Sequence, residues 1–229
     1  MTDTVLLAVL VLPALVIAIV FHEVAHGWTA YALGDPTAKN MNRLSLNPLR
    51  HVDPVGTIIL PGAMWLLGGP IFGWAKPVPV RKDRLDNPRY GMMAVAAAGP
   101  GTNLVLALIG ALLLGLIAPH IAPQDLGEPG LLAQGLFYFI MINVFLAFFN
   151  LLPIPPFDGS HIVEGLLPRS LAVHYAKFQQ FGMLLLIVLI AASWAFPGWG
   201  LIENTIGPPV DWAMRQYLTF AQSVASIFS

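Results

Sequence analysis

Residues 5–33 read VLLAVLVLPALVIAIVFHEVAHGWTAYAL, and this stretch decides the class of protein. It exceeds the roughly 20 apolar residues that a helix needs to cross the hydrocarbon core of a bilayer. No basic segment precedes it and no small-residue cleavage site follows it, so we interpret it as a retained membrane helix rather than a signal peptide. Three ionisable residues, His22, Glu23 and His26, lie inside it, where such side chains are costly and usually functional.

The composition of the whole chain agrees with a membrane protein. Of the 229 residues, 57% are hydrophobic and 10% are charged, whereas soluble domains carry about 25% charged residues. The chain therefore has too few charges to coat a globule of its size in water. A net charge of −1 provides no basic surface for nucleic acid. The chain has no cysteine, so any metal site must use histidines and carboxylates.

Three further apolar runs reach the length of a membrane span. They lie at about 91–118, 131–152 and 178–196, which predicts four spans together with the first run. The stretch 55–74 is also apolar, but it contains two prolines and five glycines. A regular helix facing lipid is unfavourable with this composition, so we expect a re-entrant or broken segment there.

The predicted fold is an all-α polytopic membrane protein. It is expected to be a helical transmembrane bundle of four spans, with the re-entrant or broken segment at 55–74 in addition. The tail at about 210–228 is expected to form either an amphipathic helix at the membrane interface or a further span. Because no repeat of fixed period and no long polar linker divides the chain, residues 1–229 are expected to form a single membrane-embedded domain.

The distribution of basic residues predicts how the spans are oriented. Eight lysines and arginines lie in the loops 35–54 and 75–90, whereas the loop 119–130 contains none. Because cytoplasmic loops carry the excess of positive charge, both basic loops are expected on the cytoplasmic side. His26 lies about 10 Å of helix rise before Leu33, at the cytoplasmic end of its span. We therefore expect a multi-pass protein of the cell membrane whose functional site lies near the cytoplasmic side.

Residues 22–26 have the pattern His-Glu-x-x-His within the first span. Two histidines at positions i and i+4 project from one face of a helix, about one turn apart, so both imidazoles can ligate a single Zn²⁺. The carboxylate of Glu23 can then reach a water at the metal and act as a general base. In the alternative, His22 and His26 are packed structural residues, which the cost of ionisable groups within a span disfavours.

A catalytic zinc site takes a third protein ligand and keeps one position for water. Asp158 is a candidate because it closely follows the third apolar run, in the sequence NLLPIPPFDG at 150–159. The three prolines break the helix, and Gly159 permits a tight turn that aims a carboxylate inward. The same pattern also fits an aspartate that caps an ordinary proline-rich turn, so both interpretations stay open at this point.

Taken together, these motifs resemble the site-2 protease family of intramembrane zinc metalloproteases. The resemblance rests on HExxH in a membrane helix, on the late Asp158-Gly159, and on Asn150 eight residues before that aspartate. It covers roughly residues 18–165. Further matching segments are GDPTA at 34–38, LNP at 46–48, HVDPVGT at 51–57, KPVPV at 76–80 and AGPGTN at 98–103. They look like the compact prokaryotic branch of the family, without the PDZ or CBS domains of other branches.

The resemblance implies one Zn²⁺ per chain and a set of residues around it. The zinc ligands would be His22, His26 and Asp158. Glu23 would be the base that takes a proton from the attacking water and later protonates the leaving amine. Asn150 would stand near the scissile carbonyl, where its amide could stabilise the oxyanion.

Two other polar residues near these motifs have open roles. Asn103 would either help to build the site or contact substrate, or make only a hydrogen bond between helices. His161, two residues after Gly159, has no family role that we can assign.

The activity implied by the resemblance is hydrolysis of peptide bonds within or next to transmembrane segments. Family members cleave membrane-tethered regulators such as anti-sigma factors or remnant signal peptides, so the expected partners are transmembrane substrates and the lipid bilayer. One alternative is a binding protein of the same fold that does not cut, but Glu23 would then have little use. Another is a divalent-metal transporter, although no duplicated pair of broken helices supports it.

Overall fold

The structure is a computed structural model that describes residues 2–66, 73–120 and 130–228. These residues contain helices and no strand, as the all-α prediction requires. The helices are α1 (Thr2–Ala32), α2 (Thr37–Asn40), α3 (Leu60–Leu66), α4 (Pro88–Ile117), α5 (Leu131–Asn150), α6 (Asp158–Leu166), α7 (Arg169–Gln179), α8 (Gly182–Ala195) and α9 (Leu201–Phe228). Short 3₁₀ or π turns lie at Pro48–His51, Pro54–Ile59, Lys82–Arg84, Ala118–His120 and Pro197–Trp199.

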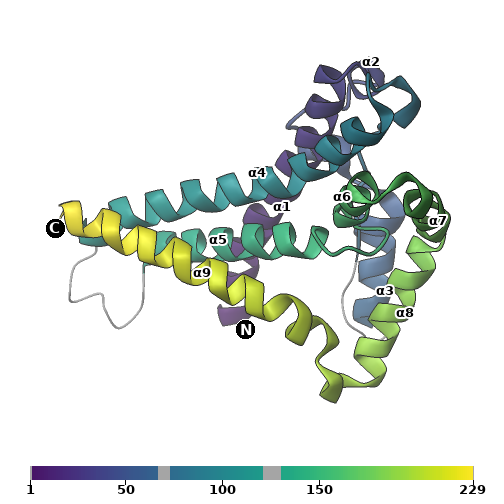
Figure 1. Ribbon diagram of the computed structural model, residues 1–229. Coiled ribbons are helices and arrows are strands. Elements are labelled where there is room, and N and C mark those ends of the chain that lie inside the picture. The colour runs from purple at the N-terminus through teal and green to yellow at the C-terminus, as the bar shows by residue number, and fades with distance from the viewer. Residues whose placement is uncertain (1, 67–72, 121–129, 229) are drawn as a thin grey trace.

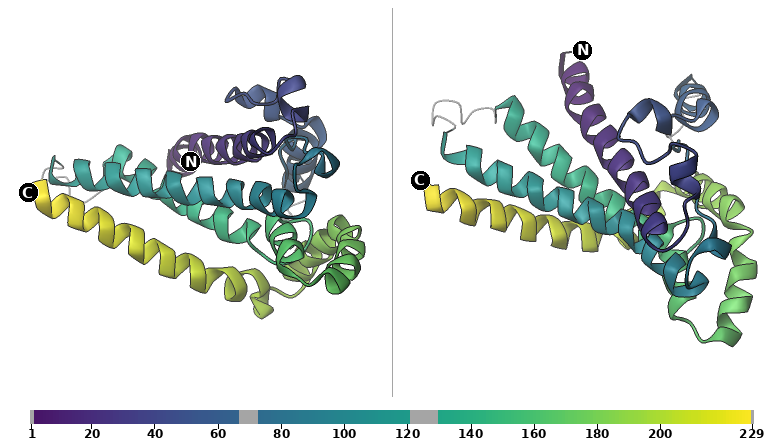
Figure 2. Two further views of the ribbon diagram at one scale, coloured as in Figure 1. Left: turned by 45° about the horizontal axis from the view of Figure 1, so that its top comes forward. Right: turned by 90° about the horizontal axis from the view of Figure 1, so that it is seen from above.

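Among the described residues, three helices are long and apolar enough to cross a membrane. They are Val5–Ala32, Pro88–Ile117 and Leu131–Asn150, and they match the first three spans predicted from the sequence. These helices, α1, α4 and α5, lie side by side with α9 in one bundle (Figure 1, Figure 2). Because α4 packs against each of the other three, it is the central helix of the bundle.

Small side chains let the bundle helices pack closely. The buried core cluster combines residues from three helices, namely Ala107, Ala111, Ile140, Val144, Ala213 and Ala221. In lipid, helices associate through such small residues because their backbones can then approach each other. A Cβ added to Gly115 of α4 would lie 2.5 Å from the carbonyl oxygen of Ala221 on α9. The C-terminal helix is therefore tightly packed against the centre of the bundle.

The C-terminal segment forms a helix of 28 residues. It runs alongside α4 and α5 to the end of the bundle at which α4 ends and α5 begins (Figure 1). The hydroxyl of Tyr217 ties it to α4 by donating to the carbonyl oxygen of Leu104 at 3.0 Å. The structure places this helix alongside α4 and α5, and it is not among the described helices that are long and apolar enough to cross a membrane.

The fourth expected span, 178–196, is not one straight helix. The helices α7 and α8 are bent by 65° relative to each other and reach the length of a span only as a pair. The bend lies beside Gly182, where an added Cβ would lie 2.9 Å from the Cβ of Pro155. Helix α8 then crosses the end of the bundle at a steep angle to α4 and α9 (Figure 2). The apolar run at 178–196 thus predicted the presence of this helix but not its direction.

The stretch 55–74 forms short helical pieces in its described part. The π turn at Pro54–Ile59 has six residues and α3 has seven, so the two together are too short to cross a bilayer. This agrees with the predicted broken segment, although 67–72 lie outside the described residues. Near this segment, α2, α6 and α7 gather at the end of the bundle where α1 ends and α4 begins (Figure 1).

Candidate metal centre

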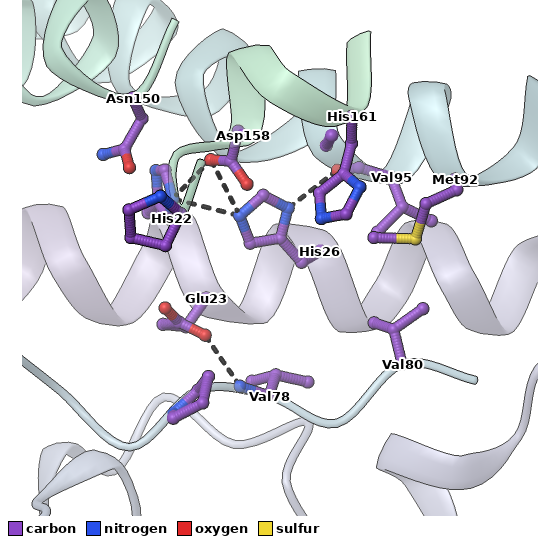
Figure 3. Close-up of a pocket in the computed structure, with 13 residues that line it drawn as sticks. His22, Glu23, His26, Val78, Val80, Met92, Val95, Asn150, Asp158 and His161 are labelled. Atoms are coloured by element: carbon purple, nitrogen blue, oxygen red, sulfur yellow. Dashed lines mark hydrogen bonds and ion pairs between the residues drawn. The ribbon is translucent and has the colours of Figure 1, made fainter. Parts of the chain in front are cut away.

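Two histidines and one aspartate converge at this end of the bundle. His22 and His26 lie one turn apart on α1, and Asp158 is the first residue of α6 (Figure 3). Oδ2 of Asp158 lies 3.2 Å from Nε2 of His22 and 3.3 Å from Nε2 of His26, and the two Nε2 atoms are 3.0 Å apart. Within the described ranges, this is the one group of three or more His, Cys, Asp or Glu side chains close enough to hold a metal ion.

Hydrogen-bond partners fix the tautomers of both imidazoles. Nδ1 of His26 lies 2.7 Å from the carbonyl oxygen of Val95, so it carries a hydrogen and donates it. Nδ1 of His22 lies 2.7 Å from Oδ1 of Asn103. The amide nitrogen of Asn103 donates to the carbonyl oxygen of Ala18 at 3.1 Å, which leaves Oδ1 as the acceptor for His22. In the neutral imidazoles, both Nε2 atoms are therefore lone-pair acceptors.

Three lone-pair atoms thus face one another at the centre of the site. The third of these atoms belongs to the carboxylate of Asp158. Its Oδ2 is buried and receives no hydrogen bond, an arrangement that costs free energy unless a cation compensates it. Two imidazole nitrogens and a carboxylate oxygen form a ligand set that suits Zn²⁺. The residues present therefore fit the metal.

The close approach of α4 to both imidazoles depends on Gly99. A Cβ added at this position would lie 2.5 Å from Cε1 and Nε2 of His26 and 2.6 Å from Cε1 of His22. Real Cβ atoms do not come so close to other heavy atoms, because their electron shells repel. Only glycine at this position leaves room for the two imidazoles in their present place.

A second glycine sets the direction of the aspartate. The turn after α5 brings the backbone of Gly159 against the carbonyl oxygens of Leu151 and Leu152, and a Cβ added to this glycine would clash with both. The prediction placed the turn at Gly159, whereas in the structure the turn lies before it, at 151–157, and Gly159 is the second residue of α6. The turn directs Asp158 toward α1, which decides between the two interpretations of this residue in favour of a side chain that faces the histidines.

A cavity of about 330 Å³ opens beside the three residues. It is also lined by Glu23, Asn150 and His161 (Figure 3). Oε2 of Glu23 accepts a hydrogen bond from the backbone N–H of Val78 at 2.7 Å, and Nδ2 of Asn150 donates to the carbonyl oxygen of Leu146 at 3.0 Å. All five site residues predicted from the sequence therefore line one cavity.

The extended segment 76–81, which carries the N–H that binds Glu23, is held at both ends by buried side chains. At one end, Nη2 of Arg43 donates to the carbonyl oxygen of Lys76 at 2.8 Å. At the other end, the N–H of Arg81 donates to Oδ2 of Asp35 at 2.6 Å. These contacts position the segment against the site.

Asp35→Asn is expected to destabilise this arrangement. Asp35 is fully buried, and its other oxygen accepts from the N–H and the hydroxyl of Thr37. Burial raises the pKa of Asp35, but the bonds from Arg81 and Thr37 lower it below its usual value overall. A carboxyl group whose pKa is lower in the folded state than in the unfolded state stabilises the fold at pH values above its unfolded-state pKa. This stabilisation is lost as the pH falls through the folded-state pKa. We expect the substitution to cost about 1–3 kcal/mol at neutral pH.

Thermal unfolding of the detergent-solubilised protein between pH 7 and pH 3 measures this effect. The midpoint of the parent protein should fall below about pH 4, and the fall should be shallower in Asp35→Asn. Asp83→Asn is the matched control, because Asp83 is an exposed partner of Arg81, and it should leave the midpoint unchanged. If Asp35→Asn has the midpoint of the parent protein at pH 7, Asp35 does not hold the extended segment.

Sequence reasoning missed two groups that support the histidines. One is the carbonyl of Val95, and a backbone group carries no signal of residue type. The other is Asn143 of α5, which is fully buried and bonds to Asn103. The rule that polar residues inside a span have partners or functions would have found Asn143. For Asn103, whose role was open, the structure shows both a contact with the site and a bond between helices.

The chain is similar to several known proteins over most of its length. The chain matches the model of Peptidase family M50 over residues 120–193. It is 39% identical over 175 residues to "Putative zinc metalloprotease YwhC" of Bacillus subtilis, covering 76% of this chain and 77% of that protein. It is 30% identical over 182 residues to "Putative zinc metalloprotease Rip2" of Mycolicibacterium smegmatis, covering 80% and 66%. The protein of the same name from Mycobacterium tuberculosis is 30% identical over 193 residues, covering 83% and 70%. No solved structure matches the chain significantly.

Proposed function

The chain belongs to peptidase family M50, a family of membrane zinc metalloproteases, and on this premise we propose that it is an intramembrane zinc endopeptidase. It hydrolyses peptide bonds within or next to transmembrane segments of other membrane proteins, as in regulated intramembrane proteolysis. The observation that carries the proposal is the group formed by His22, His26 and Asp158 beside the carboxylate of Glu23, with three of these four residues on a membrane-length helix.

In this proposal, His22, His26 and Asp158 hold the metal. When bound there, Zn²⁺ would polarise the scissile carbonyl and increase the acidity of the attacking water. Glu23 accepts the proton of that water at its carboxylate and delivers it to the nitrogen of the leaving amine. The N–H of Val78, 2.7 Å from Oε2, keeps the carboxylate oriented while it does so.

Asn150 is proposed to stabilise the oxyanion that forms on the scissile carbonyl. Its amide nitrogen has two hydrogens, one of which is donated to the carbonyl oxygen of Leu146. The second hydrogen is available to the oxyanion, since the side chain lines the cavity. One such donor is worth about 2.7–4 kcal/mol in hydrolases.

The location of the site determines what a substrate must do. A transmembrane helix satisfies its backbone groups internally, so its carbonyls cannot be attacked until it unwinds. Substrates with glycine or proline near the cut should therefore be preferred. Membrane-tethered regulators and remnant signal peptides are both suitable substrate classes, because each places a peptide segment within the bilayer.

The charge distribution supports a site on the cytoplasmic side of the cell membrane. Ten of the eleven lysines and arginines lie in the loops 35–54, 75–90 and 153–177. These loops gather at the same end of the bundle as the metal centre (Figure 1). Because basic loops stay in the cytoplasm, water and the released product would exchange with that compartment.

The function is tested with purified protein in liposomes that contain single-span substrates. Each substrate carries a Gly-Pro pair at a different depth, and a matched version carries leucines instead. We expect mass spectrometry to find cuts inside the span near its cytoplasmic end, with the leucine versions cut at least about tenfold slower. Cuts confined to loops outside the membrane would contradict the proposal, and a zinc-loaded protein that cuts no substrate would favour a binding protein.

Removal of zinc is expected to abolish cleavage and to lower the thermal stability. Without the cation, the three lone-pair atoms of His22, His26 and Asp158 repel one another. A ligand present at 100 times its Kd stabilises the folded state by about 2.7 kcal/mol, and chelation should remove this contribution. The measurements are metal content, which should be one zinc per chain, and the unfolding midpoint before chelation, after chelation and after zinc is restored. A midpoint unaffected by chelation would show that these residues do not hold the metal.

A further inference from the structure

Asn143 of α5 is fully buried and is linked to the metal centre by hydrogen bonds. Oδ1 of Asn143 accepts from Nδ2 of Asn103 at 2.9 Å, and Nδ2 of Asn143 donates to the carbonyl oxygen of Phe139 at 2.8 Å. Asn103, which is also fully buried, accepts at its Oδ1 from Nδ1 of His22 at 2.7 Å. These hydrogen bonds form a chain that leads from α5 through α4 to the first histidine on α1.

Carbonyl groups fix the direction of every bond in this chain. The amide nitrogen of Asn143 faces a carbonyl oxygen, so its Oδ1 must point to Asn103. The amide nitrogen of Asn103 then has two acceptors, the carbonyl oxygen of Ala18 at 3.1 Å and Oδ1 of Asn143 at 2.9 Å. A flipped Asn103 amide would place its oxygen against both acceptors, which is unfavourable. Asn143 thus helps to keep the oxygen of Asn103 turned toward His22.

We propose that Asn143 is a positioning residue of the zinc site, which acts through Asn103 to keep the hydrogen of His22 on Nδ1 and Nε2 free for the metal. The inference rests on the proposed function insofar as that proposal takes His22 as a ligand. Groups that orient a metal-bound histidine typically change metal affinity by 10–100-fold. Because Asn143 lies one hydrogen bond farther from the histidine, we expect an effect of about three- to tenfold.

A purely structural role for Asn143 predicts a different result. Hydrogen bonds between membrane helices contribute about 0.6 kcal/mol on average to stability, and the loss of one such bond would loosen the bundle without selectively changing zinc affinity. Val144, the next residue on α5, is also fully buried and belongs to the bundle core. Val144→Ala is therefore a matched control that removes packing but leaves the polar chain intact.

The experiment measures the zinc dissociation constant of the full chain in detergent, by competition with a chromophoric chelator and without any substrate. The variants are Asn143→Leu, which keeps the number and branching of the side-chain heavy atoms and removes the polar atoms, Asn143→Thr, Asn103→Leu and the double variant with leucine at both positions. The threonine hydroxyl can donate to the carbonyl oxygen four residues earlier and can still accept from Asn103, so it can replace both bonds of Asn143. Helical content and the unfolding midpoint are recorded for each variant.

We expect Asn143→Leu to weaken zinc binding by about three- to tenfold, Asn143→Thr to restore most of the affinity, and Val144→Ala to leave it unchanged. Since Asn143 acts through Asn103, the double variant should bind zinc no more weakly than Asn103→Leu alone. Equal zinc affinity in Asn143→Leu and the parent protein would overturn the inference, and so would equal losses in Asn143→Leu and Val144→Ala or additive losses in the double variant. If Asn143→Leu does not fold, Asn143→Thr compared with Asn143→Ser and Asn143→Ala provides the same test. Because no substrate is used, a failure of the proteolytic function cannot be mistaken for a failure of this inference.

Discussion

Glu23→Gln is expected to reduce peptide-bond cleavage by about 10²–10⁴-fold while the protein keeps its zinc. General-base catalysis contributes a rate factor of this size, and a glutamine cannot accept the proton of the attacking water. Glu23 lies outside the group of three that faces the metal position, so the substitution should leave metal content unchanged. The amide oxygen of glutamine can still accept the N–H of Val78, which contacts Oε2 at 2.7 Å in the parent protein. The substitution therefore removes the basic group and spares the contact with the extended segment.

The measurement is the initial rate of cleavage in liposomes at matched zinc content, with the cut position read by mass spectrometry. Glu23→Asp is a useful companion because it keeps a carboxylate but shortens the side chain by one methylene group. Its rate should lie between those of the parent protein and Glu23→Gln. If Glu23→Gln cuts at the rate of the parent protein, Glu23 is not the base and the proposed mechanism is wrong.

Gly99→Ala is expected to weaken zinc binding by about 10–100-fold and to reduce cleavage accordingly. The new Cβ would lie 2.5 Å from Cε1 and Nε2 of His26 and 2.6 Å from Cε1 of His22. Either both imidazoles leave their present positions or α4 moves away from α1, and inserting a methyl group into a close-packed site typically costs about 1–3 kcal/mol. Here the added methyl group would displace the two imidazoles that are proposed to hold the metal, so the free-energy cost reduces zinc affinity.

Gly101→Ala is the matched control for this second prediction. It makes the same change two residues further along α4, where an added Cβ meets no atom within 4 Å. Because alanine has a higher helix propensity than glycine, this control should be at least as stable as the parent protein. The measurements are zinc bound after dialysis against a weak chelator and the rate of cleavage. A Gly99→Ala protein that binds zinc as tightly as Gly101→Ala would mean that α4 does not confine the imidazoles.

The first three spans and the histidine pair could be predicted because both depend on local properties. Apolar length is a property of a continuous stretch, and residues at i and i+4 share one face of any helix. His22 and His26 therefore face the same way whatever the rest of the chain does. The sequence left two interpretations of Asp158, since the carboxylate in a proline-rich turn can point inward or can cap the turn. The packing of Gly159 against the end of α5 decides between them.

The helices after Asp158 could not be placed from composition. Hydropathy identified 178–196 as a span, but the bend of 65° between α7 and α8 lies beside Gly182, which packs against Pro155 in the turn after α5. The C-terminal helix has polar residues that obscure its apolar face, so the sequence left two placements for it. Its position along α4 depends on small residues such as Gly115. That Gly115 allows close packing can be recognised only once the partner helix is known.

The sequence by itself determined the membrane class, the first three spans, and the pair of histidines with an adjacent carboxylate, because each follows from neighbours in the chain. Only the tertiary structure decided how this set is completed and supported. It brings Asn103 to His22, the N–H of Val78 to Glu23, and Gly99 against both imidazoles. These contacts join residues far apart in the chain. They form through the packing of whole helices and loops, which no local pattern of residue types records.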